Sequence, residues 1–137
     1  MAKAKGKGYP QPVLDILAEK TAVLSKAQAL VEMGMPETAL ALWASAASHE
    51  ERLAPLLESL GKEREAAVHR ISAASCYQKA GDPSRAANLY RAALAGPLSE
   101  ETRPDVRRML SQCLIQLAHA AIGSSALHKA KKVPVET

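Results

Sequence analysis

The chain has 137 residues, a formal net charge of +4, two cysteines and no phenylalanine. A chain of this length fits one domain, which can bury an apolar core without disulfide or metal staples. Alanine is the most frequent residue, whereas aromatic residues make up only 3%. Because alanine favours helices and aromatic residues favour strands, this composition excludes a β-sandwich or a β-barrel.

The positive charge is concentrated near the two ends of the sequence, at Lys3, Lys5, Lys7, Lys129, Lys131 and Lys132. The remainder has almost equal numbers of acidic and basic side chains. Basic tails can contact RNA or anionic lipid, but a few terminal lysines are common, so a nucleic-acid partner is disfavoured. Charges interrupt every apolar stretch before it could span a membrane or form a signal peptide. We therefore expect a cytoplasmic protein with no membrane partner.

Proline and glycine mark the predicted helices in chain order. Three long segments begin at a proline and end at a glycine, and their apolar residues recur every three or four positions; they cover 12–34, 55–81 and 104–123. Proline is tolerated in the first turn of a helix, and glycine caps the end. Shorter helices are expected to begin at Pro36 and Pro83, each two residues after a glycine. This pattern predicts five to six helices.

Two places in this pattern are less regular. Ser48 and Glu51 resemble a capping box, yet Pro55 would fall inside the helix that they start. We predict a break at 53–55, with Gly61 inside the following helix or bending it. After Gly123 we expect a turn and a stub of one or two helical turns.

The sequence contains an internal repeat. Residues 34–46 and 81–93 align without a gap, share the glycine, the proline and several alanines, and pair Trp43 with Tyr90. A fixed period of this size indicates a stacked helical-hairpin array. We predict one domain over 12–127, with units of about 12–48, 55–96 and 104–127. Flexible basic tails are expected over 1–11 and 128–137.

The repeated positions resemble the tetratricopeptide (TPR) signature. They are Ala27, Leu30, Gly34, Ala39, Trp43 and Ala46 in the first unit, and Ala74, Tyr77, Gly81, Ala86, Tyr90 and Ala93 in the second. The small residues would let antiparallel helices approach closely, while the bulky ones fill the gaps between them. The resemblance implies a right-handed αα-hairpin solenoid of about two and a half repeats. The period of 47 residues between Gly34 and Gly81 is longer than the family's, so the helices would be elongated.

The resemblance also implies a binding groove lined by side chains of the first helix of each unit. The candidate partner-binding residues are Gln28, Glu32, Ser75, Gln78, Lys79, Gln112 and Gln116. Some members of the family hold a C-terminal carboxylate with Lys and Asn, but Leu24, Gln28, Ile71 and Ser75 stand at those places here. The expected groove combines apolar side chains such as Val31 with amide groups, which suits an apolar peptide or helix better. The alternative is that Leu24, Val68 and Ile71 are simply core residues.

No residue pattern supports catalysis, a metal site or a cofactor. The sequence contains two pairs of histidine and cysteine, His69 with Cys76 and Cys113 with His119. No C-x-x-C motif accompanies them, as a zinc site would require, and nothing in the sequence places an oxyanion hole near a cysteine. Packed cysteines in alanine-rich helices are the favoured interpretation. The acidic groups at 50–51, 63–65 and 100–101 alternate with basic residues, which predicts solvated faces rather than an acid–base pair.

Two functional hypotheses follow. The first is a non-enzymatic adaptor or scaffold that binds a peptide or helix of an unidentified protein partner. The second is a structural subunit that self-associates into a homo-oligomer or docks onto a larger complex. An RNA-associated factor that uses its basic tails is a weaker third possibility.

Overall fold

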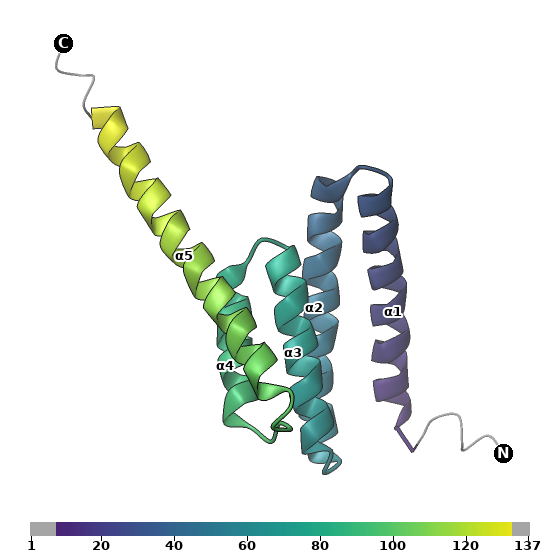
Figure 1. The fold of residues 1–137 in the computed structure, drawn as a ribbon. Helices are drawn as coiled ribbons and strands as arrows, with labels where there is room; N and C mark the ends of the chain where they lie inside the picture. Colours follow the sequence, from purple (N-terminus) through teal and green to yellow (C-terminus); the bar gives the residue numbers. More distant parts are fainter. Residues whose placement is uncertain (1–7, 133–137) are drawn as a thin grey trace.

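In the part of the chain that the structure describes, the protein forms five helices, each of which packs mainly against the next along the chain. The computed structural model describes the backbone from residue 8 to 132 and the side chains from 8 to 123. Over that range it contains no strand. The helices are α1 (Gln11–Glu32), α2 (Pro36–Ser59), α3 (Glu63–Lys79), α4 (Pro83–Ala95) and α5 (Arg103–Lys132). Figure 1 shows α1 and α5 at opposite edges of this arrangement. The expected all-helical class is confirmed.

The first three connections have the same backbone geometry. Gly34, Gly61 and Gly81 have φ values of 80°, 77° and 85°, in the left-handed region that favours glycine. In each turn the N–H after the glycine donates to a carbonyl five residues earlier, as from Met35 to Leu30 and from Asp82 to Tyr77. These bonds satisfy carbonyl groups that the helix end would leave unpaired. They fold α1 back onto α2, and α3 onto α4.

The predicted break at 53–55 is wrong, because α2 continues through Pro55 to Ser59. The turn is at Gly61, and Ser48 and Glu51 lie inside the helix rather than capping one. The continuous helix buries Leu53 and Leu57 in a small core cluster with Val13 and Ile16 of α1. This burial offsets the backbone hydrogen bond that Pro55 removes. The second unit therefore starts with α3 at Glu63, not at Pro55.

The expected turn after Gly123 is also absent. Gly123 lies within α5, which runs without interruption from Arg103 to Lys132. The proline that follows Gly34 and Gly81 two residues later has no counterpart here, and the next residues, Ser124 and Ser125, offer little apolar surface to bury. The third unit thus contributes one helix. Figure 1 shows the far end of α5 extending away from the other helices.

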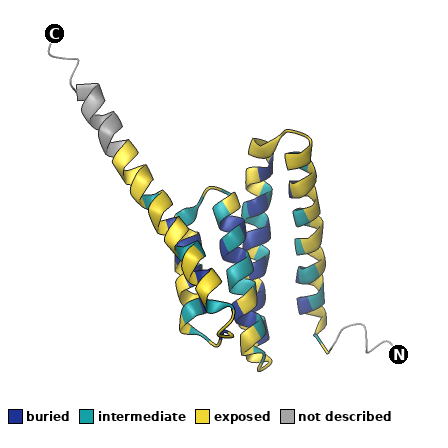
Figure 2. Ribbon diagram, in the orientation of Figure 1, coloured by how far each residue is buried: buried dark blue, intermediate teal, exposed yellow. Residues whose placement is uncertain are grey.

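The larger part of the core uses the residues that the repeat predicts. Ala27, Ala39, Ala46, Ala74, Ala86 and Ala93 are completely buried, and Trp43, Tyr77 and Tyr90 are also buried. Leu30 is half-buried against this cluster. Figure 2 shows the buried residues concentrated on α2, α3 and α4, whereas most of α5 up to residue 123 is exposed. Alanines at the helix crossings allow close backbone approach, and the aromatic side chains fill the remaining space.

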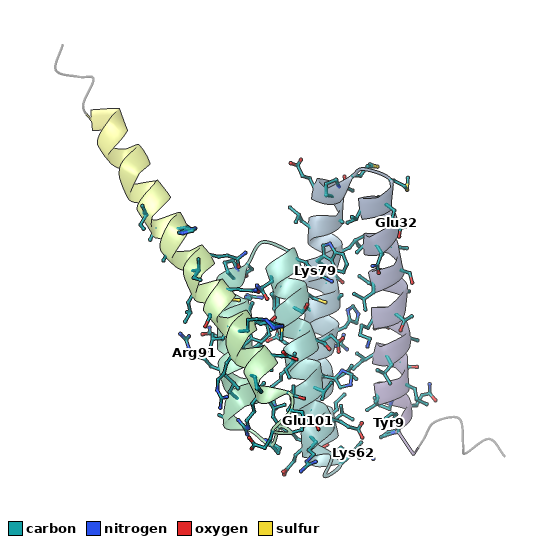
Figure 3. The ribbon with its side chains drawn as sticks, viewed as in Figure 1. Tyr9, Glu32, Lys62, Lys79, Arg91 and Glu101 are labelled. Atoms are coloured by element: carbon teal, nitrogen blue, oxygen red, sulfur yellow. The ribbon has the colours of Figure 1, made fainter. Side chains whose placement is uncertain are left out.

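The folded body begins earlier in the chain than the predicted tail of residues 1–11 allows. The Tyr9 hydroxyl donates a hydrogen bond to Glu65, and the Lys62 ammonium lies 5.6 Å from the centre of the Tyr9 ring. Figure 3 shows Tyr9 close to the α2–α3 turn. Tyr9 therefore belongs to the folded body, and α1 begins at Gln11. Likewise, residues 128–132 continue α5, while residues 1–7 and 133–137 of the predicted tails lie outside the described residues.

Candidate functional site

A hollow lies beside the α1–α2 turn, where the last turns of α1 and the first turns of α2 meet the end of α3. Its volume is about 430 Å³, and it is lined by Gln28, Val31, Glu32, Pro36, Leu40, Trp43 and Lys79. Val31 and Leu40 are 44% and 41% exposed, so their side chains are accessible from solvent. We call these seven residues the hairpin hollow.

The hairpin hollow combines apolar walls with a polar edge. The Lys79 ammonium lies 4.6 Å from the centre of the Trp43 ring, which is only 7% exposed. Such a cation–π contact contributes about 0.5–1 kcal/mol at an exposed site, and it fixes the lysine over one side of the indole. Figure 3 shows Glu32 and Lys79 near the same end of the helices, on α1 and α3 respectively. The hairpin hollow therefore presents one carboxylate, one ammonium and one amide group, from Glu32, Lys79 and Gln28. They surround an apolar floor formed by Val31, Leu40 and Trp43.

Three of the seven predicted binding residues are brought together here. Gln28, Glu32 and Lys79 line the hairpin hollow, as does Val31, which the expected groove also included. Ser75 is half-buried on α3 and does not line it. Gln112 and Gln116 are exposed on α5, which packs against α4 at the other edge of the fold.

Gln78 has a different role from the one predicted. Its side-chain oxygen accepts a hydrogen bond of 2.6 Å from the hydroxyl of buried Tyr90. The amide therefore satisfies a core phenol instead of facing a ligand. Any substitution of Gln78 would disturb the α3–α4 hairpin, which makes this residue unsuitable as a probe of partner binding.

The α2 contribution to the hollow was not predicted. The sequence predicted Pro36 only as the start of a helix and Trp43 only as a packing residue, and it did not single out Leu40. Leu40 directly follows the completely buried Ala39, so it points about a quarter of a turn away from that residue, and it is 41% exposed. Exposed Met33 and Met35 on the adjoining turn extend the apolar surface.

A buried polar cluster joins the first three helices. Glu50 of α2 is 3% exposed, and it accepts a hydrogen bond of 2.5 Å from Nδ1 of His69 on α3. The Lys20 ammonium of α1 lies 3.4 Å from its other oxygen. The predicted solvated face is therefore wrong for Glu50. A buried carboxylate needs such partners, because desolvation without them would be costly.

The contacts of this cluster are those of a structural ion-pair network. Glu50 is occupied by its two partners, and the neighbouring His49 donates to the Ser45 carbonyl at 2.7 Å and faces Glu19 at 3.3 Å. Next to it, the hydroxyl of Tyr77 donates to Glu51 at 2.6 Å. Each polar group is paired within the protein, so the cluster holds α1, α2 and α3 in a fixed arrangement.

The two thiols are free and buried. Burial raises the pKa of Cys76, and the nearby Glu50 carboxylate adds to this shift; burial also raises the pKa of Cys113. A raised pKa disfavours the thiolate, which is the nucleophilic form. His69 bonds to Glu50 rather than to Cys76. Between residues 8 and 123, no three His, Cys, Asp or Glu side chains are grouped so that they could hold a metal ion.

Comparison of the chain with family models, with curated proteins and with solved structures finds no match. Within the described part of the chain, none of the helices combines the length and apolar character needed to cross a membrane. The class that the fold defines is thus an all-helical protein built from consecutively packed helices, with a solvent-accessible apolar hollow at one end of its first hairpin.

Proposed function

We propose that the protein is a non-enzymatic, TPR-like adaptor that binds a helix or an extended peptide of a partner protein in the hairpin hollow. This proposal depends mainly on one observation. The hairpin hollow combines the apolar residues Val31, Leu40 and Trp43 with a polar rim, which consists of Gln28, Glu32 and Lys79. An apolar anchor side chain of the partner would occupy the floor. Gln28, Glu32 and Lys79 would bond to its backbone or to flanking polar groups.

The size and chemistry of the hollow favour this use. A volume of about 430 Å³ lies within the range of ligand pockets, about 300–1,000 Å³, and accommodates a few side chains of a peptide. The rim offers groups that hold a ligand, whereas activation of a water or a nucleophile would require a base within reach of a reactive group. A solenoid of TPR-like hairpins is part of the proposal, supported by the burial of the repeated alanines and aromatic residues.

A cytoplasmic setting is also part of the proposal. Both cysteines are free, which is the usual state of thiols in a reducing compartment. The partner itself would be recognised through an apolar anchor next to polar groups.

The experiment uses the single tryptophan as a reporter. Because Trp43 is the only tryptophan and forms part of the hollow, a bound peptide should change its fluorescence. Helical and extended peptides selected from a displayed library on the wild-type protein would be titrated against Leu40→Glu and against Val68→Glu. Both sites are exposed, at 41% and 53%, so both variants should fold.

We expect Leu40→Glu to weaken binding about tenfold or more, which corresponds to about 1.4 kcal/mol, while Val68→Glu binds as the wild type does. Circular dichroism of both variants checks that the helix content is unchanged. Peptides that bind equally well to Leu40→Glu would show that the hairpin hollow is not the binding site.

A further inference from the structure

The last helix has two apolar sides, of which one is packed within the fold. Val106 and Cys113 are completely buried on the side toward α4. Another side carries five exposed apolar residues, among which Ile115 and Ile122 are 55% and 65% exposed. Because successive residues are about 100° apart, these five span about 120° of the helix surface. We call them the α5 stripe; they are Leu114, Ile115, Ala118, Ala121 and Ile122.

The internal repeat relates α5 to α3. Val106 and Cys113 stand forty positions after Ala66 and Ala73, and all four residues are completely buried. Ala66 belongs to the core cluster that contains residues 53 and 57 of α2. The side by which α5 packs on α4 is therefore equivalent to the side by which α3 packs on α2.

The same offset shows what kind of surface fits the α5 stripe. Leu114 and Ala118 correspond to Ala74 and Gln78 of α3. That side of α3 carries α4, since Ala74 is completely buried and Gln78 accepts a hydrogen bond from Tyr90. At Leu114, which is 40% exposed, no helix of the described part of the chain takes the place of α4. The α5 stripe is thus shaped to receive a helix.

The charge pattern narrows the choice of helix. Residues 109–128 include no Asp, Glu, Lys or Arg. A partner that binds through charge, such as a nucleic acid or an acidic peptide, would find no opposite charge along this segment. An apolar helix side is the matching surface.

The sizes of the side chains match those of a second, antiparallel copy of α5. Ser111 is exposed on the same side of the helix as the stripe. When Ile115 lies opposite Ala118 of the second copy, Ile122 comes opposite Ser111 of that copy, and Leu114 lies beside the same alanine. The two-fold axis repeats each of these pairs. Large side chains therefore meet small ones throughout the contact, which allows close packing.

This register also keeps like charges apart. Arg107 and Arg108 come level with positions 126 and 125 of the second copy, inside its uncharged segment. The lysines at positions 129, 131 and 132 come level with positions 104, 102 and 101, none of which is basic. Repulsion between like charges thus does not oppose the pairing.

We propose that two copies of the protein pair through their α5 stripes, with the two helices antiparallel. Each α5 then holds for the other the place that α4 has on α3. The contact is isologous, so it stops at a dimer. A single pair of helices buries less than the about 1,200 Å² of a standard interface, so the dissociation constant should be on the order of 100 μM.

The first test is the mass in solution, measured by sedimentation over a concentration series. The wild-type mass should rise from the 14.6 kDa of one copy toward twice that value and no further. High salt should leave it unchanged, since no ion pair contributes to the contact. Ile115→Glu with Ile122→Glu should be monomeric, because the contact would bury unpaired carboxylates.

Gln112→Glu with Gln116→Glu is the matched control. Both glutamines are exposed on α5 outside the stripe, and this variant gains the same charge as the stripe variant. It should dimerise as the wild type does. Circular dichroism checks that both variants keep the helix content of the wild type.

The second test is a disulfide between two chains, which measures the register. An oxidised mixture of Ser111→Cys and Ile122→Cys should form a cross-linked dimer. Each variant alone should not, because equal positions of two antiparallel copies lie about 16 Å apart along the helix, too far for a disulfide. The wild type is the control for Cys76 and Cys113, which are both buried. Cross-linking of each variant with itself would indicate a parallel pair and overturn the proposal.

Three further outcomes would overturn it. One is a wild-type chain that stays monomeric at about 1 mM, ten times the expected dissociation constant. Another is a Leu40→Glu variant that no longer dimerises, because the stripe would then bind in the hairpin hollow of the second copy. The third is a monomer that sediments with vesicles of phosphatidylcholine and phosphatidylserine and loses this binding in Ile115→Glu with Ile122→Glu, which would assign the stripe to a lipid surface.

Discussion

Among the side chains that the structure describes, Tyr90 is the largest that is completely buried. Its hydroxyl donates to Gln78 at 2.6 Å and lies 3.6 Å from the sulfur of Met109, so it joins α4 to both α3 and α5. Burial raises the pKa of Tyr90 to about 12 from its ordinary value of 10.0, and the nearby Cys113 and Cys76 thiols contribute to the shift. The folded state therefore favours the neutral phenol.

This shift predicts a loss of stability at alkaline pH. In the unfolded chain Tyr90 loses its proton near pH 10, whereas in the folded protein it keeps the proton until about pH 12. Between these values the unfolded state binds fewer protons, so the free energy of unfolding should fall as the pH rises. Chemical denaturation below pH 10 and again between pH 10 and 12 measures the change. Tyr90→Phe removes this contribution, so an equal loss in that variant would contradict the assignment.

Residues at equivalent repeat positions show why the site was only partly predictable. Val31 and Gln78 both lie three residues before a turn glycine, and the helical pattern placed both in a groove. Val31 does line the hairpin hollow, but Gln78 bonds to Tyr90 of the next helix. Periodicity identifies the side of a helix on which a residue lies, but it does not specify which neighbouring side chain lies opposite. Glu50 illustrates the same point, because its partners Lys20 and His69 come from two other helices.

At the scale of the elements, α2 is the helix whose length the sequence predicted least well. The positions of Gly34, Gly81, Pro36 and Pro83 predicted the turns correctly, since each residue acts through local backbone geometry. Pro55 predicted a break by the same logic. The structure keeps the helix continuous because Leu53 and Leu57, on either side of the proline, are buried against α1 and α3. Tertiary burial decides such a case, and a single sequence does not show it.

The continuous α2 makes Pro55→Ala a stabilising change. Alanine restores an N–H that can donate to the carbonyl of Glu51, and it removes a residue that costs about 3 kcal/mol relative to alanine inside a helix. Pro55 is exposed, so no core contact is lost. Thermal denaturation should show a higher melting temperature. Pro12→Ala is the control, because Pro12 lies in the first turn of α1, where proline is tolerated. An unchanged or lower melting temperature for Pro55→Ala would favour a helix start at that residue.

For the molecule as a whole, the contacts run in sequence order, and the core divides into two clusters. One contains Val13, Ile16 and Leu57 at the start of α1 and the end of α2, and the other contains the repeated alanines and aromatic residues. In a fold that packs neighbour on neighbour, stability is approximately a sum of local terms. A substitution that destabilises one cluster should therefore reduce mainly the local stability of the helices that form it.

Ile16→Ala and Val106→Ala test this division. Both residues are buried, and truncation of a buried aliphatic side chain to alanine costs about 1–5 kcal/mol. Native-state hydrogen exchange should show faster exchange mainly in α1 for Ile16→Ala, and mainly in α4 and α5 for Val106→Ala. Equal loss of protection in all helices for both variants would show that the protein unfolds as a single unit.

The predominance of alanine among the buried residues has a calorimetric consequence. An alanine that is fully buried removes much less apolar surface from water than a buried leucine or phenylalanine, and the heat capacity of unfolding is proportional mainly to the apolar surface exposed. This protein should therefore have a heat capacity change per residue below the usual range of about 12–15 cal/mol/K. Its stability curve would be flatter than that of a leucine-rich bundle of the same size. The free energy of unfolding would consequently decrease only slightly on cooling below the temperature of maximum stability.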